Sequence, residues 1–145
     1  FLTGSDFIIN NQKLASLPTR DAMLPIIIII VLSKKNQIPI SQLVNSLPKR
    51  FTVSDRIQDY PMSKSKNLLS KYITSDAINR DFGAFFGDVR NIELTDGLKI
   101  FFDSKNSLHI RASGNAPELR IYIESFSAEQ ALVLLKKSIE VILKK

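Results

Sequence analysis

The sequence contains no cysteine, no tryptophan and a single histidine, His109. Without cysteine there is no disulfide and no cysteine-ligated metal site, and nothing indicates an oxidising compartment. A lone histidine also argues against a histidine-based metal site and against a histidine-dependent catalytic triad. The residue types therefore argue against thiol chemistry, a disulfide framework and a histidine- or cysteine-ligated metal site.

Long apolar segments are scarce as well. The longest apolar run, residues 22–32, is shorter than the roughly 20 residues that a membrane-spanning helix needs. It also lacks the charged leader and small-residue cleavage site of a signal peptide. We therefore expect a cytoplasmic protein without a membrane partner. Because the chain begins with Phe1 and not with methionine, we also expect it to be a piece of a longer protein.

The net charge of +6 comes from 20 basic and 14 acidic residues and is scattered along the chain. Residues 1–50 hold six basic and two acidic side chains, and residues 51–145 hold fourteen and twelve. Nucleic-acid-binding domains usually gather their excess charge on one face or one helix. The composition therefore predicts no nucleic-acid partner. A free-standing module that binds nucleic acid through a basic sheet face is kept as the alternative.

The sequence pattern changes near Pro48–Phe51, where helical segments give way to an extended segment with alternating polarity, and this change predicts a domain boundary there. Residues 1–50 then carry a helix that Thr19 caps and that ends at Lys34–Lys35, followed by a short helix that begins at Ser41 and stops before Pro48. The remaining residues, 51–145, form the second domain.

The second domain is predicted to be an α+β layer. Alternating polarity and turn residues predict an antiparallel four-stranded sheet, and the apolar faces of two amphipathic helices should pack on one side of it. Ser127 and Gln130 form a capping box at the start of the last helix. The predicted elements are an extended segment at 51–57, a helix at 63–73, an irregular stretch at 75–88, strands at 89–94, 97–102, 107–111 and 118–126, and a helix from 127 onward.

The segment RASGNAPELR, residues 111–120, gathers residues that core packing does not require. Side chains alternate between the two faces of a strand, so the apolar residues around Arg111 and Arg120 place both arginines on the open face of the sheet. Two like charges on one surface repel unless an anion lies between them.

The turn between these arginines offers further anion-binding groups: the Ser113 hydroxyl, the Asn115 amide, and a glycine, Gly114, whose flexibility allows backbone N–H groups to turn inward as a nest. Arginine is suited to gripping phosphate oxygens two at a time. The same residue types are also common in ordinary solvated turns. From the residues alone, a phosphate-binding loop and a plain turn both remain open.

Together with the preceding DGLKIFF and LHI, the stretch RASGNAPELRIYIES resembles the C-terminal domain of the α-D-phosphohexomutases, the phosphomannomutase/phosphoglucomutase superfamily. The resemblance implies a fold like that of the TATA-box-binding protein, with a loop that binds the phosphate that is not transferred. In this chain that phosphate would be held by Arg111, Ser113, Gly114, Asn115 and Arg120, and Pro117 would shape the loop. Ala112 replaces the Pro of the family pattern, which loosens the loop slightly, and Asn115 replaces its Thr but keeps a hydrogen-bond donor. Ala116 replaces its Glu and so removes a carboxylate beside the anion, which leaves the sugar preference open.

FLTGSDF and LPTRDAMLP resemble the end of the third, α/β domain of bacterial members. The resemblance therefore implies that residues 1–50 are the remnant of domain 3 and residues 51–145 are domain 4. Both domains would work with upstream domains of the same enzyme.

The resemblance also implies the reaction of the parent enzyme. An intramolecular phosphotransferase of this family interconverts hexose 1-phosphate and hexose 6-phosphate, with mannose or glucose phosphate as substrate. It uses an active-site serine, Mg²⁺ in an Asp-rich loop, and hexose 1,6-bisphosphate as activator or intermediate. Neither the serine loop nor the metal loop occurs here, so we predict no catalytic residue and no metal ligand in this chain, and no catalysis by the chain alone. Phosphoglucosamine mutase is a rival specificity.

Some polar residues fall outside this pattern. The acidic pairs Asp55/Asp59 and Asp76/Asp81 lack metal-binding spacing and are predicted to be solvated surface or cap residues. His109, which shares a strand face with Arg111, is predicted to be either a hydrogen-bond partner of the ligand or an adjacent loop, or a plain surface histidine.

Overall fold

The computed structural model describes residues 6–16 and 22–144, and the chain divides into two compact units after Pro48. The first unit contains a hairpin and two helices: β1 (Phe7–Ile9), β2 (Gln12–Leu14), α1 (Met23–Asn36) and α2 (Ile40–Asn45). Asn10 and Asn11 turn the hairpin with φ of 50° and 60°, the positive values that a tight two-residue hairpin turn favours. The predicted cap Thr19 lies outside the described residues. Ser41 is not a cap, because α2 begins one residue earlier, after Pro39.

Helix α1 is apolar around its whole circumference. Each of residues 26–32 exposes between 39% and 54% of its surface, and no residue of α1 is buried. A helix that is apolar on all sides is typical of the interior of a larger protein. Within the described residues, no helix is both long enough and apolar enough to cross a membrane.

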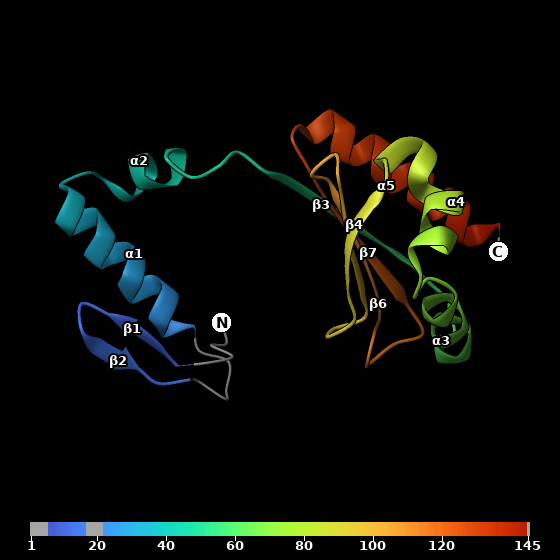
Figure 1. Cartoon of the computed structure of the whole chain (residues 1–145), viewed down its shortest axis with the longest axis horizontal. Helices are drawn as coiled ribbons and strands as arrows, with labels where there is room; N and C mark the ends of the chain where they lie inside the picture. Colours follow the sequence, from blue (N-terminus) through green and yellow to red (C-terminus); the bar gives the residue numbers. More distant parts are fainter. Residues whose placement is uncertain (1–5, 17–21, 145) are drawn as a thin grey trace. The chain divides into compact units, whose positions relative to one another are not determined.

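The second unit, from Lys49 onward, is a five-stranded antiparallel sheet with three helices (Figure 1). The strand order is β3-β7-β6-β5-β4, so the first strand in the sequence pairs with the last. The elements are β3 (Phe51–Ile57), α3 (Met62–Lys71), α4 (Ser75–Phe86), β4 (Val89–Glu93), β5 (Leu98–Phe102), β6 (Ser107–Ala112), β7 (Leu119–Ser125) and α5 (Ala128–Leu143).

This architecture confirms the predicted α+β class and the antiparallel sheet with helices on one side. The sheet has one strand more than the four predicted, because the extended segment 51–57 pairs along its whole length with β7. That pairing joins residues more than sixty positions apart, and strand alternation alone does not show which edge a segment will join.

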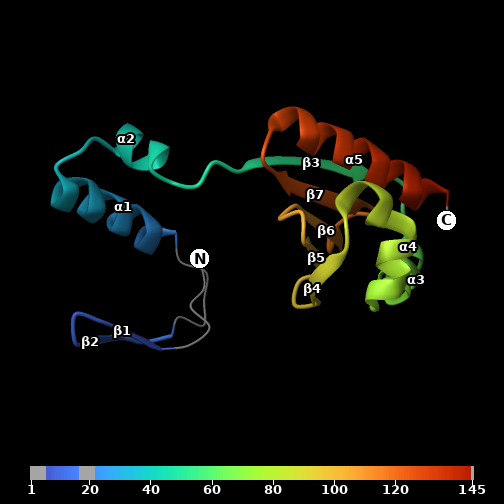
Figure 2. The same cartoon turned by 45° about the horizontal axis from the view of Figure 1, so that its top comes forward.

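The helices cover one face of the sheet, and the core lies beneath them (Figures 1 and 2). The strands β5, β6 and β7 contribute alternate side chains, as expected for a sheet with one buried face. Their fully buried residues are Leu98, Ile100, Phe102, Leu108, Ile110, Leu119, Ile121 and Ile123. The opposite face of the sheet carries polar and charged side chains and is left open by these helices.

The prediction that residues 75–88 are irregular was wrong, because most of this segment forms α4. Ile78, Phe82 and Phe86 recur every four residues and are fully buried. Phe86 stacks on Phe102 of the sheet at a centroid distance of 4.5 Å. Gly87 ends the helix with a φ of +86°, a value that favours glycine.

Half of the predicted capping box at α5 is confirmed. The Ser127 hydroxyl accepts a hydrogen bond from the Gln130 backbone N–H at 3.1 Å. The Gln130 side chain does not bond back to the Ser127 backbone as a capping box requires. Its oxygen instead accepts a hydrogen bond from the Ser125 hydroxyl at 2.6 Å. Ser125 is fully buried at the end of β7, so this contact fixes the helix start to the sheet.

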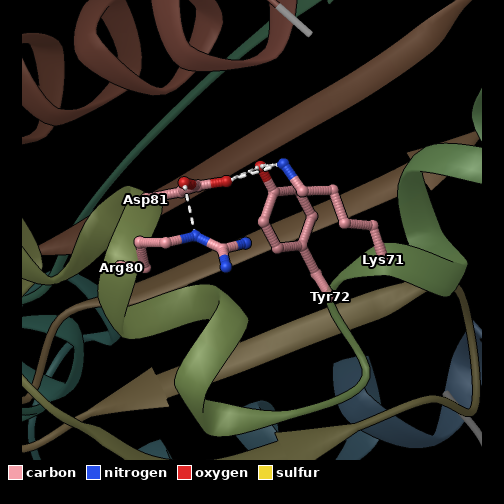
Figure 3. Close-up of polar contacts among 4 residues, drawn as sticks. All are labelled: Lys71, Tyr72, Arg80 and Asp81. Atoms are coloured by element: carbon pink, nitrogen blue, oxygen red, sulfur yellow. Dashed lines mark hydrogen bonds and ion pairs between the residues drawn. The ribbon is translucent and has the colours of Figure 1, made fainter.

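A polar cluster joins the end of α3 to α4 (Figure 3). The Tyr72 hydroxyl donates to Asp81 Oδ2 at 2.8 Å, and Lys71 Nζ lies 2.7 Å from the same oxygen. Arg80 approaches the other carboxylate oxygen at 3.4 Å. The Asp81 side chain is only 7% exposed, so the prediction of a solvated surface residue was wrong here. Burying a carboxylate is costly unless it is paired and hydrogen-bonded, and this cluster provides both.

The Tyr72 phenol makes stability depend on alkaline pH. Burial, and then its hydrogen bond to Asp81, raise the pKa of Tyr72 above its ordinary value of 10.0. The stabilisation that this neutral phenol provides is complete below about pH 10 and is lost as the pH rises further, because only the unfolded phenol then ionises. The loss should approach about 1.4 kcal/mol per pH unit.

Urea unfolding followed by circular dichroism between pH 8 and 11.5 tests this prediction, with Tyr72→Phe as the comparison. Below pH 10 the wild type should be more stable by about 1 kcal/mol because it keeps the hydrogen bond to Asp81. Above pH 10 the difference between the free energies of unfolding of the two proteins should shrink. If the free energies of unfolding of the two proteins change in parallel from pH 8 to 11.5, ionisation of Tyr72 does not cause the loss of stability.

Candidate functional site

Three arginines form a row across the open face of the sheet. Arg111 of β6 lies directly opposite Arg120 of β7, and Arg120 lies directly opposite Arg56 of β3. The neighbouring residues Ile110, Leu119 and Ile121 are buried on the other face, which confirms that Arg111 and Arg120 share the open side. Like charges directly opposite each other on a sheet are destabilising, so this row holds two unfavourable pairs.

The loop 113–118 connects the two arginine-bearing strands at this end of the sheet. Its ends are closed by the hydrogen bond from the Ser113 N–H to the Glu118 carbonyl at 2.9 Å. The Pro117 carbonyl accepts the N–H of Tyr60 at 2.8 Å, which anchors the loop to the segment after β3. A hollow of about 310 Å³ lies beside the loop and is lined by Tyr60, Met62, Ser65 and residues 112–118. Three of the predicted phosphate-binding residues, Ser113, Gly114 and Asn115, therefore border one hollow.

The predicted backbone nest at Gly114 is not formed. A nest needs a left-handed residue, and no residue between 111 and 120 has a positive φ. A Cβ added at Gly114 would meet no atom within 4 Å, so neither packing nor backbone geometry requires glycine at this position. The open space beside Gly114 leaves room for a ligand to approach the backbone closely.

Arg111 is held from two sides. Its Nη1 lies 2.9 Å from Asp96 Oδ2, and its guanidinium lies over the Tyr122 ring, 5.9 Å from the centroid. Hydrogen bonding to Tyr122, and then to Asp96, raises the pKa of Arg111 further above its ordinary value, which already keeps the guanidinium cationic. Its Nε is buried without a hydrogen-bond partner, the one side-chain atom of this kind found among the described residues. A buried donor without a partner costs stability, so Arg111 keeps an unsatisfied N–H within the row.

The turn before β5 packs closely against the backbone of Arg111. Gly97 has a φ of +83°, and a Cβ there would lie 2.5 Å from the Ile110 carbonyl and 2.7 Å from Arg111 Cβ. Only glycine fits this approach, which brings Asp96 beside the arginine. The His109 ring stacks on Tyr122, and its Nε2 lies 2.6 Å from the Asp96 carbonyl. His109 thus contacts an adjacent loop, one of the roles predicted for it.

Three members of this arrangement were not predicted from the sequence: Arg56, Asp96 and Glu118. Glu118 Oε1 lies 3.0 Å from Arg56 Nη1, and its other oxygen lies 3.9 Å from Arg120 Nη2. The DGL turn signal before β5 could have placed Asp96 near β6, since adjacent strands of a meander lie side by side. No local signal predicts the Arg56 pairing, because it depends on which edge β3 joins.

The described residues include no group of three or more histidine, cysteine, aspartate or glutamate side chains that could hold a metal ion. Two acidic residues beside the row, Asp96 and Glu118, each form an ion pair with an arginine. The donor set at this site therefore suits an anion and does not fit Mg²⁺, and no metal-dependent step is assigned to these residues.

Comparison with known proteins agrees with this geometry. Residues 50–139, more than half of the chain, match the family model described as phosphoglucomutase/phosphomannomutase, C-terminal domain. The chain belongs to the phosphoglucomutase/phosphomannomutase family. The matched region contains the whole arginine row and the loop 113–118, and it confirms the resemblance seen in the sequence.

Two phosphomannomutases are among the relatives of this family member. One from Salmonella muenchen is 43% identical over 135 residues, which cover 90% of this chain and 27% of that protein. One from Sinorhizobium fredii (strain NBRC 101917 / NGR234) is 35% identical over 141 residues, which cover 97% of this chain and 30% of that protein. The chain thus spans less than a third of the length of these curated relatives.

Proposed function

We propose that the loop and the arginines beside it bind the phosphate group of a hexose phosphate. The residues that hold it are Arg111, Ser113, Gly114, Asn115 and Arg120. The observation that carries the proposal is the pair of arginines directly opposite each other, one with a buried and unpartnered Nε. A phosphate oxygen near Arg111 would relieve the repulsion between the guanidinium groups and supply a hydrogen-bond acceptor.

In this proposal the chain is the C-terminal part of a cytoplasmic phosphomannomutase/phosphoglucomutase that interconverts hexose 1-phosphate and hexose 6-phosphate. The loop grips the phosphate that is not transferred, while upstream domains supply the nucleophile. The parent enzyme would use Mg²⁺ and hexose 1,6-bisphosphate, and its metal ligands lie in those other domains. Both relatives named above are phosphomannomutases, which favours mannose phosphate as the substrate.

The first unit fits the same proposal as the last part of domain 3. Its helix α1 exposes apolar side chains all round, the pattern of a helix that the rest of a domain covers. We infer that residues 1–50 complete domain 3 and that residues 51–145 form domain 4, the phosphate-binding domain.

A titration of the ¹⁵N-labelled chain with inorganic phosphate at constant ionic strength tests the proposal. The amide signals of residues 111–120 should shift in a saturable way, and an equal ionic strength of chloride should leave them unchanged. Mannose 6-phosphate should shift the same signals. Shifts that are absent, or spread evenly over the basic surface, would contradict the proposed phosphate site.

A further inference from the structure

Arg56 extends the proposed phosphate site beyond the loop. It lies directly opposite Arg120, and the two side chains help to line a second hollow of about 360 Å³ on the open face, together with Ser54, Asp55 and Tyr122. Asp55 accepts the backbone N–H of Arg56 at 2.8 Å. Arg120 therefore lies between two other arginines, with Arg111 on one side and Arg56 on the other.

Glu118 lies between the two hollows. It helps to line the hollow beside the loop, and its carboxylate reaches the two arginines that line the second hollow. The Glu118 backbone is fixed by two hydrogen bonds. Its carbonyl accepts the Ser113 N–H at 2.9 Å, and its N–H donates to the Ala116 carbonyl at 2.8 Å. An exchange would therefore have to move the side chain alone. One carboxylate thus contacts two guanidinium groups, with its oxygens 3.0 Å from Arg56 Nη1 and 3.9 Å from Arg120 Nη2.

We propose that Arg56 is a third arginine of the anion site, and that a bound phosphate replaces the Glu118 carboxylate between Arg56 and Arg120. This inference rests on the proposed phosphate-binding function. The Glu118 side chain is only 12% exposed, whereas that of Arg56 is more than half exposed, and an ion pair with an exposed partner contributes little. The cost of the exchange therefore lies mainly in moving the Glu118 carboxylate, which becomes exposed to water when the phosphate takes its place. A phosphate carries more charge and more acceptor oxygens than the carboxylate, so it competes well for the same guanidinium groups.

Substitutions at Arg56 and Glu118 should change the affinity for phosphate in opposite directions. Arg56→Ala should weaken inorganic phosphate binding by about three- to tenfold, because one charged donor is lost. Glu118→Gln should strengthen it by about two- to fivefold, because the competing negative charge is removed while the side chain keeps its size. If Glu118 only oriented the arginines, its replacement would weaken binding instead.

The experiment is a phosphate titration of the full 145-residue chain at constant ionic strength, followed through backbone amide and arginine Nε–H signals. Arg90→Ala is the matched control for the loss of one positive charge. Arg90 lies on β4, the edge strand at the opposite side of the sheet from β3. Glu140→Gln, exposed on α5, is the control for Glu118→Gln. Both controls should keep the wild-type affinity.

The outcomes separate the inference from the proposed function. If the wild type shows no phosphate-dependent shifts at residues 111–116, the proposed function fails and the inference fails with it. If the wild type binds phosphate there and Arg56→Ala binds equally well, the third-arginine role is overturned and the proposed function stands. If Glu118→Gln binds with unchanged or lower affinity, the exchange is overturned.

Discussion

Replacing Phe82 with alanine is expected to lower the free energy of unfolding of the second unit by about 3–5 kcal/mol. Phe82 is fully buried on α4 and packs edge-on against Tyr72, with ring centroids 5.1 Å apart. It also contacts Phe86, which in turn stacks on Phe102 of the sheet. Removing the central ring would leave a cavity among large side chains that cannot collapse to fill it.

Tyrosine fluorescence during urea unfolding measures this effect selectively, because all three tyrosines, Tyr60, Tyr72 and Tyr122, lie in the second unit. The matched control is Phe126→Ala. Phe126 is half exposed and stacks under Arg50, so its loss should cost about 1 kcal/mol. If Phe82→Ala and Phe126→Ala lower the free energy of unfolding by similar amounts, Phe82 does not have the central packing role proposed for it. Since small domains are stable by only about 5–15 kcal/mol, the Phe82 variant should lie close to its unfolding threshold.

The sheet face was predictable because strand alternation depends only on local sequence. Arg111 and Arg120 alternate with buried apolar residues, and this pattern sufficed to place both on the open side. Helix α4 was missed although Ile78, Phe82 and Phe86 carry a four-residue period. That period crosses a glycine and three phenylalanines, which weaken the local helical preference, and packing against the sheet decides the outcome.

The parts of the site that were missed depend on tertiary pairing. Arg56 reaches the row only because β3 joins the edge next to β7, and no residue near Arg56 specifies that choice. Glu118 was not recognised as a partner because both of its arginines had to be placed first. At Gly114 the turn residues suggested a nest, whereas the loop closes without any left-handed residue. Sequence pattern therefore placed Arg111 and Arg120 on one face, and only the folded sheet revealed Arg56 and the carboxylates that pair with these arginines.

Arg111→Ala is expected to raise the dissociation constant for inorganic phosphate by at least about tenfold, the effect of losing hydrogen bonds to a charged group. The fold should tolerate this change. The ion pair that is lost joins a partly buried arginine to an exposed carboxylate, since the Asp96 side chain is 69% exposed, and pairs with an exposed partner contribute about 0–1 kcal/mol. The same substitution removes a buried N–H that has no partner, which offsets part of the cost.

Arg111→Lys separates the charge of Arg111 from its shape. Lysine keeps the positive charge and loses the planar fork that grips two oxygens, so its affinity should lie between those of the wild type and Arg111→Ala. Titrations of all three proteins, with Arg90→Ala as the control for charge and urea unfolding as the control for folding, measure both effects. Equal affinities for Arg111→Ala and Arg90→Ala would show that phosphate responds only to net charge. A selective loss at Arg111 with unchanged stability would instead mean that this arginine is retained for its ligand, because the folded sheet gains little from it.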